Sequence, residues 1–157
     1  MESTGLIRTS GKRASLGLIA LLALAGCASH REPIRELPPI PITYELSSFQ
    51  VEKAIMDGCK RRNWIPSKKP DGSIEAALFL RNHVAVVKIT YARDSYTIRY
   101  ARSENLDYVH RAGGSDEIHS KYNEWVMNLV RYIDSSLERA SRERGGDRRS
   151  PARGDAA

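Results

Sequence analysis

The fold is decided by the stretch Gly72–Tyr100, which reads GSIEAALFLRNHVAVVKITYARDSYTIRY. Apolar side chains alternate with others through three successive runs, and this alternation indicates β-strands with one buried face. The connections at Asn82-His83 and Arg93-Asp94 are short, so we expect an antiparallel meander. The predicted core face comprises Ile74, Ala76, Leu78, Leu80, Ala85, Val87, Ile89, Tyr91, Tyr96, Ile98 and Tyr100.

Helical patterns flank the meander on both sides. Ser47 with Gln50 resembles a capping box, and apolar spacing after it predicts a helix whose buried face holds Val51, Ala54, Ile55, Gly58 and Cys59. A second helix is predicted from about Asp116 to Leu137, with a stripe of Ile118, Tyr122, Trp125, Val126, Leu129, Ile133 and Leu137. Two prolines and Asp71-Gly72 predict that the segment after Asn63 is a loop.

These patterns predict an α+β fold of order α-β-β-β-α. The three-stranded antiparallel meander would pack on the two helices as a two-layer sandwich, and an additional short strand is expected at Ile42–Leu46. The expected organisation is a signal peptide at 1–26, an acylated N-terminus and proline-rich tether at 27–46, the folded domain at 47–138 and a disordered arginine-rich tail at 139–157.

The N-terminus is typical of an export signal. Arg8, Lys12 and Arg13 precede an apolar run, Leu16–Ala25, that is too short to cross a bilayer. The run ends in Leu24-Ala25-Gly26-Cys27, which resembles the bacterial lipobox, in which a dedicated peptidase accepts the small residues and the cysteine thiol receives a diacylglycerol. The alternative is an ordinary secretory signal with a coincidental cysteine.

By this resemblance Cys27 becomes the mature N-terminus and holds the chain at a membrane. Each buried methylene contributes about 0.8 kcal/mol, and stable anchoring needs more than one acyl chain. No aspartate follows Cys27, which favours the periplasmic leaflet of the outer membrane. The chain carries a net charge of +6, of which residues 1–26 contribute +2, so the mature chain lacks a nucleic-acid footprint. We expect an envelope protein or cell-wall polymer as partner, and the oligomeric state is open.

A broader resemblance covers roughly Ser47 to Leu137. The segments AIMDGCKRRNW, YTIRYARSENLDY and IHSKYNEWVMNLVRYI, together with the meander, resemble a group of small, functionally uncharacterised bacterial lipoproteins. The pattern I-H-x-x-Y-N-x-W at the start of the last helix is its most specific motif. The resemblance implies an envelope location and this domain, and it implies no activity or cofactor.

Catalytic and metal-binding patterns are not found in the sequence. His30, His83, His110 and His119 do not have metal-ligand spacing, and there is no nucleophile elbow, P-loop or dinucleotide fingerprint. Cys59 lies on the apolar helix face and loses its only thiol partner if Cys27 is acylated, so we expect a buried small side chain. The prediction is a protein that is not an enzyme and has no cofactor.

Two candidate sites follow from these patterns. Ser103, Asn105, His119 and Asn123 could converge on a small polar ligand, in a periplasmic receptor or hydrolase, or could simply cap turns. The face of the sheet opposite the core could instead dock a partner, in a non-catalytic binding or scaffolding module, unless the N-terminal segment covers it. Its candidate residues are Phe79, Val84, Val86, Lys88 and Arg99.

The anchor can be tested directly. Because Cys27 is the only residue of the motif that can carry a thioether-linked lipid, Cys27→Ser should abolish both lipid labelling and cleavage by the lipoprotein peptidase. Labelling with a radioactive or alkyne fatty acid measures the first effect, and the apparent mass of the product measures the second. Normal processing and membrane retention of this variant would contradict the prediction.

Overall fold

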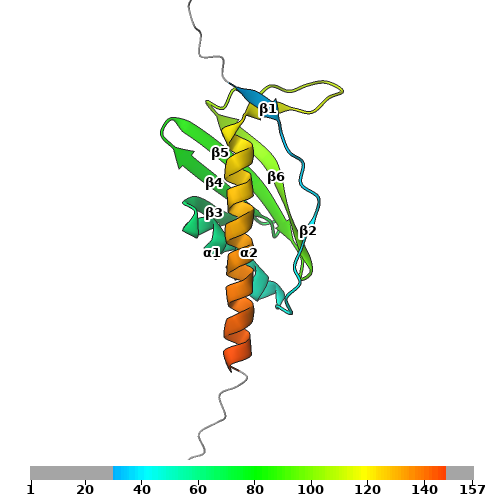
Figure 1. Ribbon diagram of the computed structural model, residues 1–157, viewed down its shortest axis with the longest axis vertical. Coiled ribbons are helices and arrows are strands. Elements are labelled where there is room, and N and C mark those ends of the chain that lie inside the picture. Colours follow the sequence, from blue (N-terminus) through cyan, green and yellow to red (C-terminus); the bar gives the residue numbers. More distant parts are fainter. Residues whose placement is uncertain (1–29, 148–157) are drawn as a thin grey trace, which may run out of the picture.

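The computed structural model describes residues 30–147, so the predicted signal peptide, Cys27 and residues 148–157 lie outside the described residues (Figure 1). Helices α1 (Ser48–Arg61) and α2 (Lys121–Asp147) accompany two antiparallel sheets. The larger has the strand order β2-β6-β5-β4-β3, formed by β2 (Ile40–Pro41), β3 (Trp64–Lys68), β4 (Ile74–Leu80), β5 (His83–Tyr91) and β6 (Ser95–Glu104). The smaller pairs β1 (Arg31–Pro33) with β7 (Glu117–His119).

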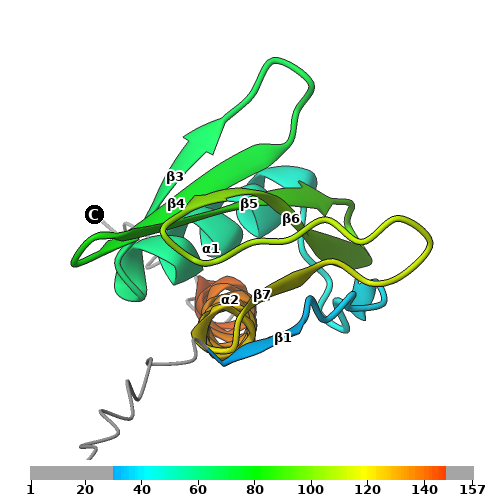
Figure 2. The same ribbon diagram turned by 90° about the horizontal axis from the view of Figure 1, so that it is seen from above.

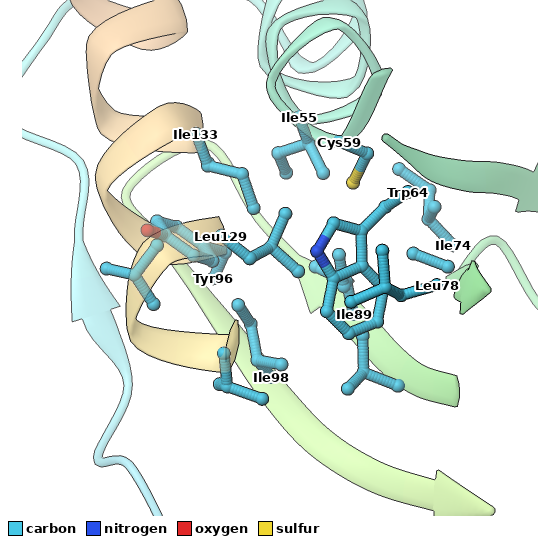
Figure 3. Packing of buried hydrophobic residues seen from close by; sticks show 14 of the residues in the cluster. Ile55, Cys59, Trp64, Ile74, Leu78, Ile89, Tyr96, Ile98, Leu129 and Ile133 are labelled. Atoms are coloured by element: carbon cyan, nitrogen blue, oxygen red, sulfur yellow. The ribbon is translucent and has the colours of Figure 1, made fainter. Parts of the chain in front are cut away.

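Both helices lie on the same face of the five-stranded sheet, as the view in Figure 2 shows. This confirms the predicted α+β architecture with a sheet packed on two helices. Burial of the inner strand positions against the helices drives the packing, and the side chains of Ile55, Ile89 and Leu129 lie in this layer (Figure 3). The predicted core positions are buried or partly buried, except Leu80, which is exposed at the end of β4.

The capping box of α1 is also confirmed. The Ser47 hydroxyl accepts a hydrogen bond from the Gln50 amide at 3.2 Å, and the Gln50 side chain accepts one from the Ser47 amide at 2.9 Å. Two of the amides that a helix N-terminus leaves without intrahelical partners are thereby satisfied. The helix begins where the sequence indicates.

The loop prediction after Asn63 is wrong. Residues Trp64–Lys68 form β3, an edge strand paired with β4, and Trp64 is buried in the core. Pro66 obscured this strand in the sequence, because proline is excluded from central strands but tolerated at a sheet edge.

The second helix differs from its prediction at both ends. Residues 117–119 form β7, because the Glu117 and His119 amides donate to the carbonyls of Val109 and Leu106 rather than within a helix. The helix begins at Lys121 and continues to Asp147, so residues 139–147 are helical where a disordered tail was predicted. Leu137 is fully buried and Ala140 packs against the core, which extends the ordered region.

The proline-rich segment is part of the domain rather than a tether. Ile34, Ile42 and Leu46 are buried in the core, and the Ile34 amide donates to the Asp116 carbonyl at 2.7 Å. The expected strand at Ile42–Leu46 is also displaced, because the residues that pair with β6 are Ile40 and Pro41. The folded domain therefore begins at β1, well before residue 47.

The two helices approach each other closely where Gly58 of α1 faces Ile133 of α2. A Cβ atom built on Gly58 would lie 2.7 Å from the Ile133 Cα and 2.9 Å from its backbone nitrogen. These atoms belong to a helical backbone and cannot move aside as a flexible side chain does. Glycine at this position sets the distance between α1 and α2.

This contact predicts the effect of Gly58→Ala. Alanine normally stabilises a helix interior by up to about 1 kcal/mol relative to glycine, but here the methyl group forces the helices apart, and overpacking costs about 1–3 kcal/mol. We expect a net loss of unfolding free energy in urea denaturation. Gly145→Ala in α2 is the matched control, because a Cβ atom at that position would have no neighbour within 4 Å, and it should be neutral or stabilising. Equal effects of the two changes would contradict the close approach.

Candidate functional site

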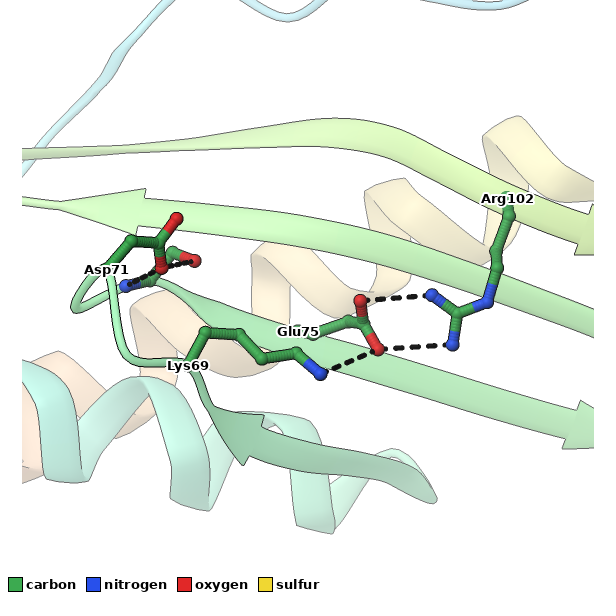
Figure 4. A network of polar contacts seen from close by, with 5 residues as sticks. Lys69, Asp71, Glu75 and Arg102 are labelled. Atoms are coloured by element: carbon green, nitrogen blue, oxygen red, sulfur yellow. Dashed lines mark hydrogen bonds and ion pairs between the residues drawn. The ribbon is translucent and has the colours of Figure 1, made fainter.

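The outer face of the sheet, opposite the helices, carries a network of ion pairs (Figure 4). Arg102 donates through both terminal nitrogens to Glu75, at 3.0 and 3.1 Å, and Lys69 lies 3.2 Å from the same carboxylate. The hydrogen bonds from Arg102 hold the pKa of Glu75 below its ordinary value. Arg102 reaches this face because of a register shift between β5 and β6, which pairs Val86 with Arg102 but Val87 with Tyr100.

Val86 does not contribute to an exposed patch, contrary to the prediction. It points outward, but its exposed fraction is 1%. It pairs with Ala77 on one side and Arg102 on the other, and Arg102 extends across β5 to reach Glu75 on β4. The long side chain therefore covers Val86.

Lys88 and Arg99, the two basic residues predicted for the partner surface, are exposed, and each forms an ion pair within the domain. Lys88 donates to Asp71 at 2.7 Å, and Asp71 also accepts hydrogen bonds from the amide and hydroxyl of Ser73 in the β3–β4 connection. These donors, Lys88 first, lower the pKa of Asp71. Arg99 lies 3.2 Å from Glu36 and donates to the Leu37 carbonyl, so it ties the N-terminal segment to β6.

Apolar side chains remain exposed on the outer face at the β3 and β4 side. Ile65 is 62% exposed and Phe79 is 60% exposed, and strand pairing places them beside Ala77 and the partly buried Val84. We call Ile65, Ala77, Phe79 and Val84 the outer apolar patch. Ile65 was missed in the sequence because β3 was interpreted as a loop.

Pro66 protects the open edge of β3 next to this patch. The Lys69 amide donates to the Ser73 carbonyl, so the N–H of Lys69 points toward the β4 side. Because the backbone N–H and C=O groups of alternate residues in an antiparallel pair point to the partner strand, those of Ser67 and Ile65 also point toward β4. The backbone of Pro66 therefore faces the open edge, where proline supplies no N–H. The missing N–H disfavours pairing of a further strand with β3. A partner would therefore contact the patch through side chains.

The polar side chains of Ser103, Asn105 and Asn123, predicted for a ligand site, form hydrogen bonds within the domain. Ser103 lies 3.0 Å from the Tyr100 hydroxyl, and Asn105 donates to the Asn82 carbonyl at 2.6 Å. Asn123 is buried, accepts from the Arg35 amide at 3.1 Å and donates to the Pro33 carbonyl at 3.0 Å. The Asn123 amide thus holds the N-terminal segment against α2.

His119 has a neighbour that the sequence did not indicate. The ring centroids of His119 and His83 lie 6.1 Å apart. Those of His83 and Trp125 lie 6.4 Å apart. His83 Nδ1 donates to the Asn105 carbonyl, which can only accept, whereas His119 Nδ1 accepts from the Lys121 amide. The distance between His83 and His119 along the chain hid this pair. Its contacts fasten the β4–β5 hairpin to the start of α2.

Cys59 is buried, as predicted. Burial raises the pKa of its thiol to about 12, so the thiolate that a nucleophile requires is scarce at neutral pH. Within residues 30–147, no three His, Cys, Asp or Glu side chains form a group suited to a metal ion. In the same part of the chain, neither helix combines the length and apolar composition of a membrane span.

Comparisons with known proteins found no matching family model, no similar curated protein and no similar solved structure. The resemblance to small lipoproteins therefore stays a prediction.

A structural role for Asn123 predicts a large effect of its removal. Asn123→Ala leaves the Arg35 amide and the Pro33 carbonyl without their partner, and a buried unsatisfied polar group costs about 1–3 kcal/mol. Asn128→Ala is the matched control on the same helix, because the Asn128 side chain accepts a hydrogen bond from Arg131 three residues later and holds no distant segment by a hydrogen bond within residues 30–147. Urea denaturation should show a loss of stability for the first change and little for the second. Similar small losses for both would contradict the structural role of Asn123.

Proposed function

We propose that this chain is a lipid-anchored protein of the bacterial cell envelope and acts as a non-catalytic binding module. Cys27 would hold it to the outer membrane facing the periplasm, and the outer apolar patch would bind a partner protein. The observation that carries the proposal is that both helices cover one face of the sheet, while Ile65 and Phe79 stand in solvent on the other.

The composition of the outer face supports docking. A fully solvated sheet face is usually polar throughout, whereas here two large apolar side chains lie next to the Glu75–Arg102 and Lys88–Asp71 ion pairs. Protein interfaces commonly combine an apolar centre with a polar rim, and a few large side chains supply most of the binding energy. The N-terminal segment reaches this sheet at β2 and through Arg99, on the side away from the patch.

The alternative function, a small-ligand receptor or hydrolase at His119 and Asn123, has less support. The amide of Asn123 is occupied by the backbone of Pro33 and Arg35, and Nδ1 of His119 by the backbone of Lys121. Both contacts are those of structural residues.

The binding proposal is tested with the intact lipoprotein in cells. A photo-crosslinking amino acid at position 65 should form an adduct with one defined envelope protein, and Phe79→Glu should remove that adduct while leaving the melting temperature nearly unchanged, since the side chain is exposed. Phe49→Glu is the matched control, because Phe49 is 73% exposed but lies at the start of α1. Loss of the adduct in the control, or no adduct at position 65, would contradict the proposal.

A further inference from the structure

At one end of the domain, β1 and the tip of the β4–β5 hairpin lie close to β7. Arg31 of β1 pairs with His119 of β7, whose ring lies 6.1 Å from that of His83. His83 pairs with Leu80 across the hairpin, which turns through Arg81 and Asn82. We call this region the anchor end and residues Leu80–Asn82 the hairpin tip.

The chain is fixed to the anchor end from its first described residue. The Ser120 amide donates to the His30 carbonyl at 2.9 Å, and the β1–β7 pairing follows immediately. Four peptide units separate Cys27 from Arg31, and a fully extended chain spans at most about 3.6 Å per residue. A lipid on Cys27 would therefore lie within about 14 Å of β1.

The hairpin tip carries side chains suited to a membrane interface. Leu80 is 45% exposed although it points to the helix side of the sheet, and Arg81 beside it is exposed. Within residues 30–147 no acidic side chain forms an ion pair with Arg81. An apolar side chain next to a cation fits the boundary between acyl chains and anionic headgroups.

Backbone geometry gives a second, independent observation at the tip. Arg81 has φ 57, in the left-handed region that glycine and asparagine adopt most readily. An arginine at this position lowers the stability of the turn relative to glycine. Strain of this kind at an exposed position points to a use for the side chain.

We propose that the hairpin tip lies in the headgroup region of the same bilayer that holds the acylated Cys27, with Arg81 on anionic phospholipid and Leu80 at the acyl boundary. This inference rests on the proposed lipid anchor. It orients the domain with β1 and the hairpin tip toward the membrane. The Ala92–Asp94 turn, at the other end of the nine-residue strand β5, then lies farther from the membrane, by at most about 30 Å, given the rise of about 3.4 Å per strand residue.

Fluorescence of the processed, full-length lipoprotein in vesicles of phosphatidylethanolamine and phosphatidylglycerol tests this orientation. Leu80→Cys and, as the matched control, Phe49→Cys are each labelled with an environment-sensitive dye in a Cys59→Ala background. Phe49 is also exposed and apolar, and it adjoins Ser48, which shares a surface hollow with Arg93 of the distant turn. The dye at position 80 should shift to the blue and be quenched by nitroxide-labelled lipid, whereas the dye at position 49 should do neither.

Absence of quenching at position 80, or equal quenching at both positions, would overturn the orientation. The mass of the N-terminal peptide from the same preparation reports whether Cys27 is acylated, so failure of the anchor is distinguished from another orientation of an anchored domain. Arg81→Gly relieves the backbone strain of the turn and removes the cationic side chain. It should therefore raise the melting temperature and weaken the quenching at position 80. A higher melting temperature with unchanged quenching would show that Arg81 does not contribute to the proposed contact with phospholipid.

Discussion

The close approach of Gly58 and Ile133 is the constraint on which the other contacts depend. With no side chain on Gly58, the backbone of α2 lies directly against α1, and both helices can pack on the same face of one sheet. Asn123 lies ten residues before Ile133, about 15 Å along the helix, and holds the backbone of Pro33 and Arg35. The helix crossing therefore positions the contact that holds residues 33–35 against α2.

This arrangement gives the domain one distinct end and one open sheet face. Strand β1 and the hairpin tip lie at one end, and the outer apolar patch lies on the face that the helices leave open. In the proposed function the anchor end faces the bilayer, and the patch, in which Phe79 adjoins Leu80 of the hairpin tip, is presented to a partner close to the membrane surface. In that arrangement the proposed contact of the hairpin tip with the headgroups, and not the position of Cys27 alone, would set the direction of the patch.

The alternation between Ile74 and Tyr100 and the capping box at Ser47 were sufficient to predict the two-layer α+β fold, because both depend on local spacing. Features that depend on distant partners were missed. Pro66 is compatible with β3 only because that strand is at the edge, and residues 117–119 become a strand only because β1 lies beside them. The proline-rich segment looked like a tether since its few apolar residues, among them Ile34, give no periodic signal.

The candidate sites were predicted less well for the same reason. Phe79 was placed correctly by strand alternation, but Val86 was not, since the register shift that brings Arg102 over it cannot be recognised in one sequence. The pairing of His83 with His119 joins two segments that are far apart in the chain. Asn123 was correctly assigned to the start of the helical region, but its backbone partners lie in the segment that was predicted to be a tether.

The central claim is that the folded domain begins at β1, four residues after Cys27, the proposed site of the lipid anchor. Amide hydrogen exchange of the acylated protein tests it most directly at Ile34 and Arg35, whose amides donate to the Asp116 carbonyl and the Asn123 side chain. Both amides should exchange far more slowly than in an unfolded chain, together with amides of the β1–β7 pair. Exchange at the rate of an unfolded chain would show that this segment is a free tether and would remove the basis for an oriented, membrane-facing domain.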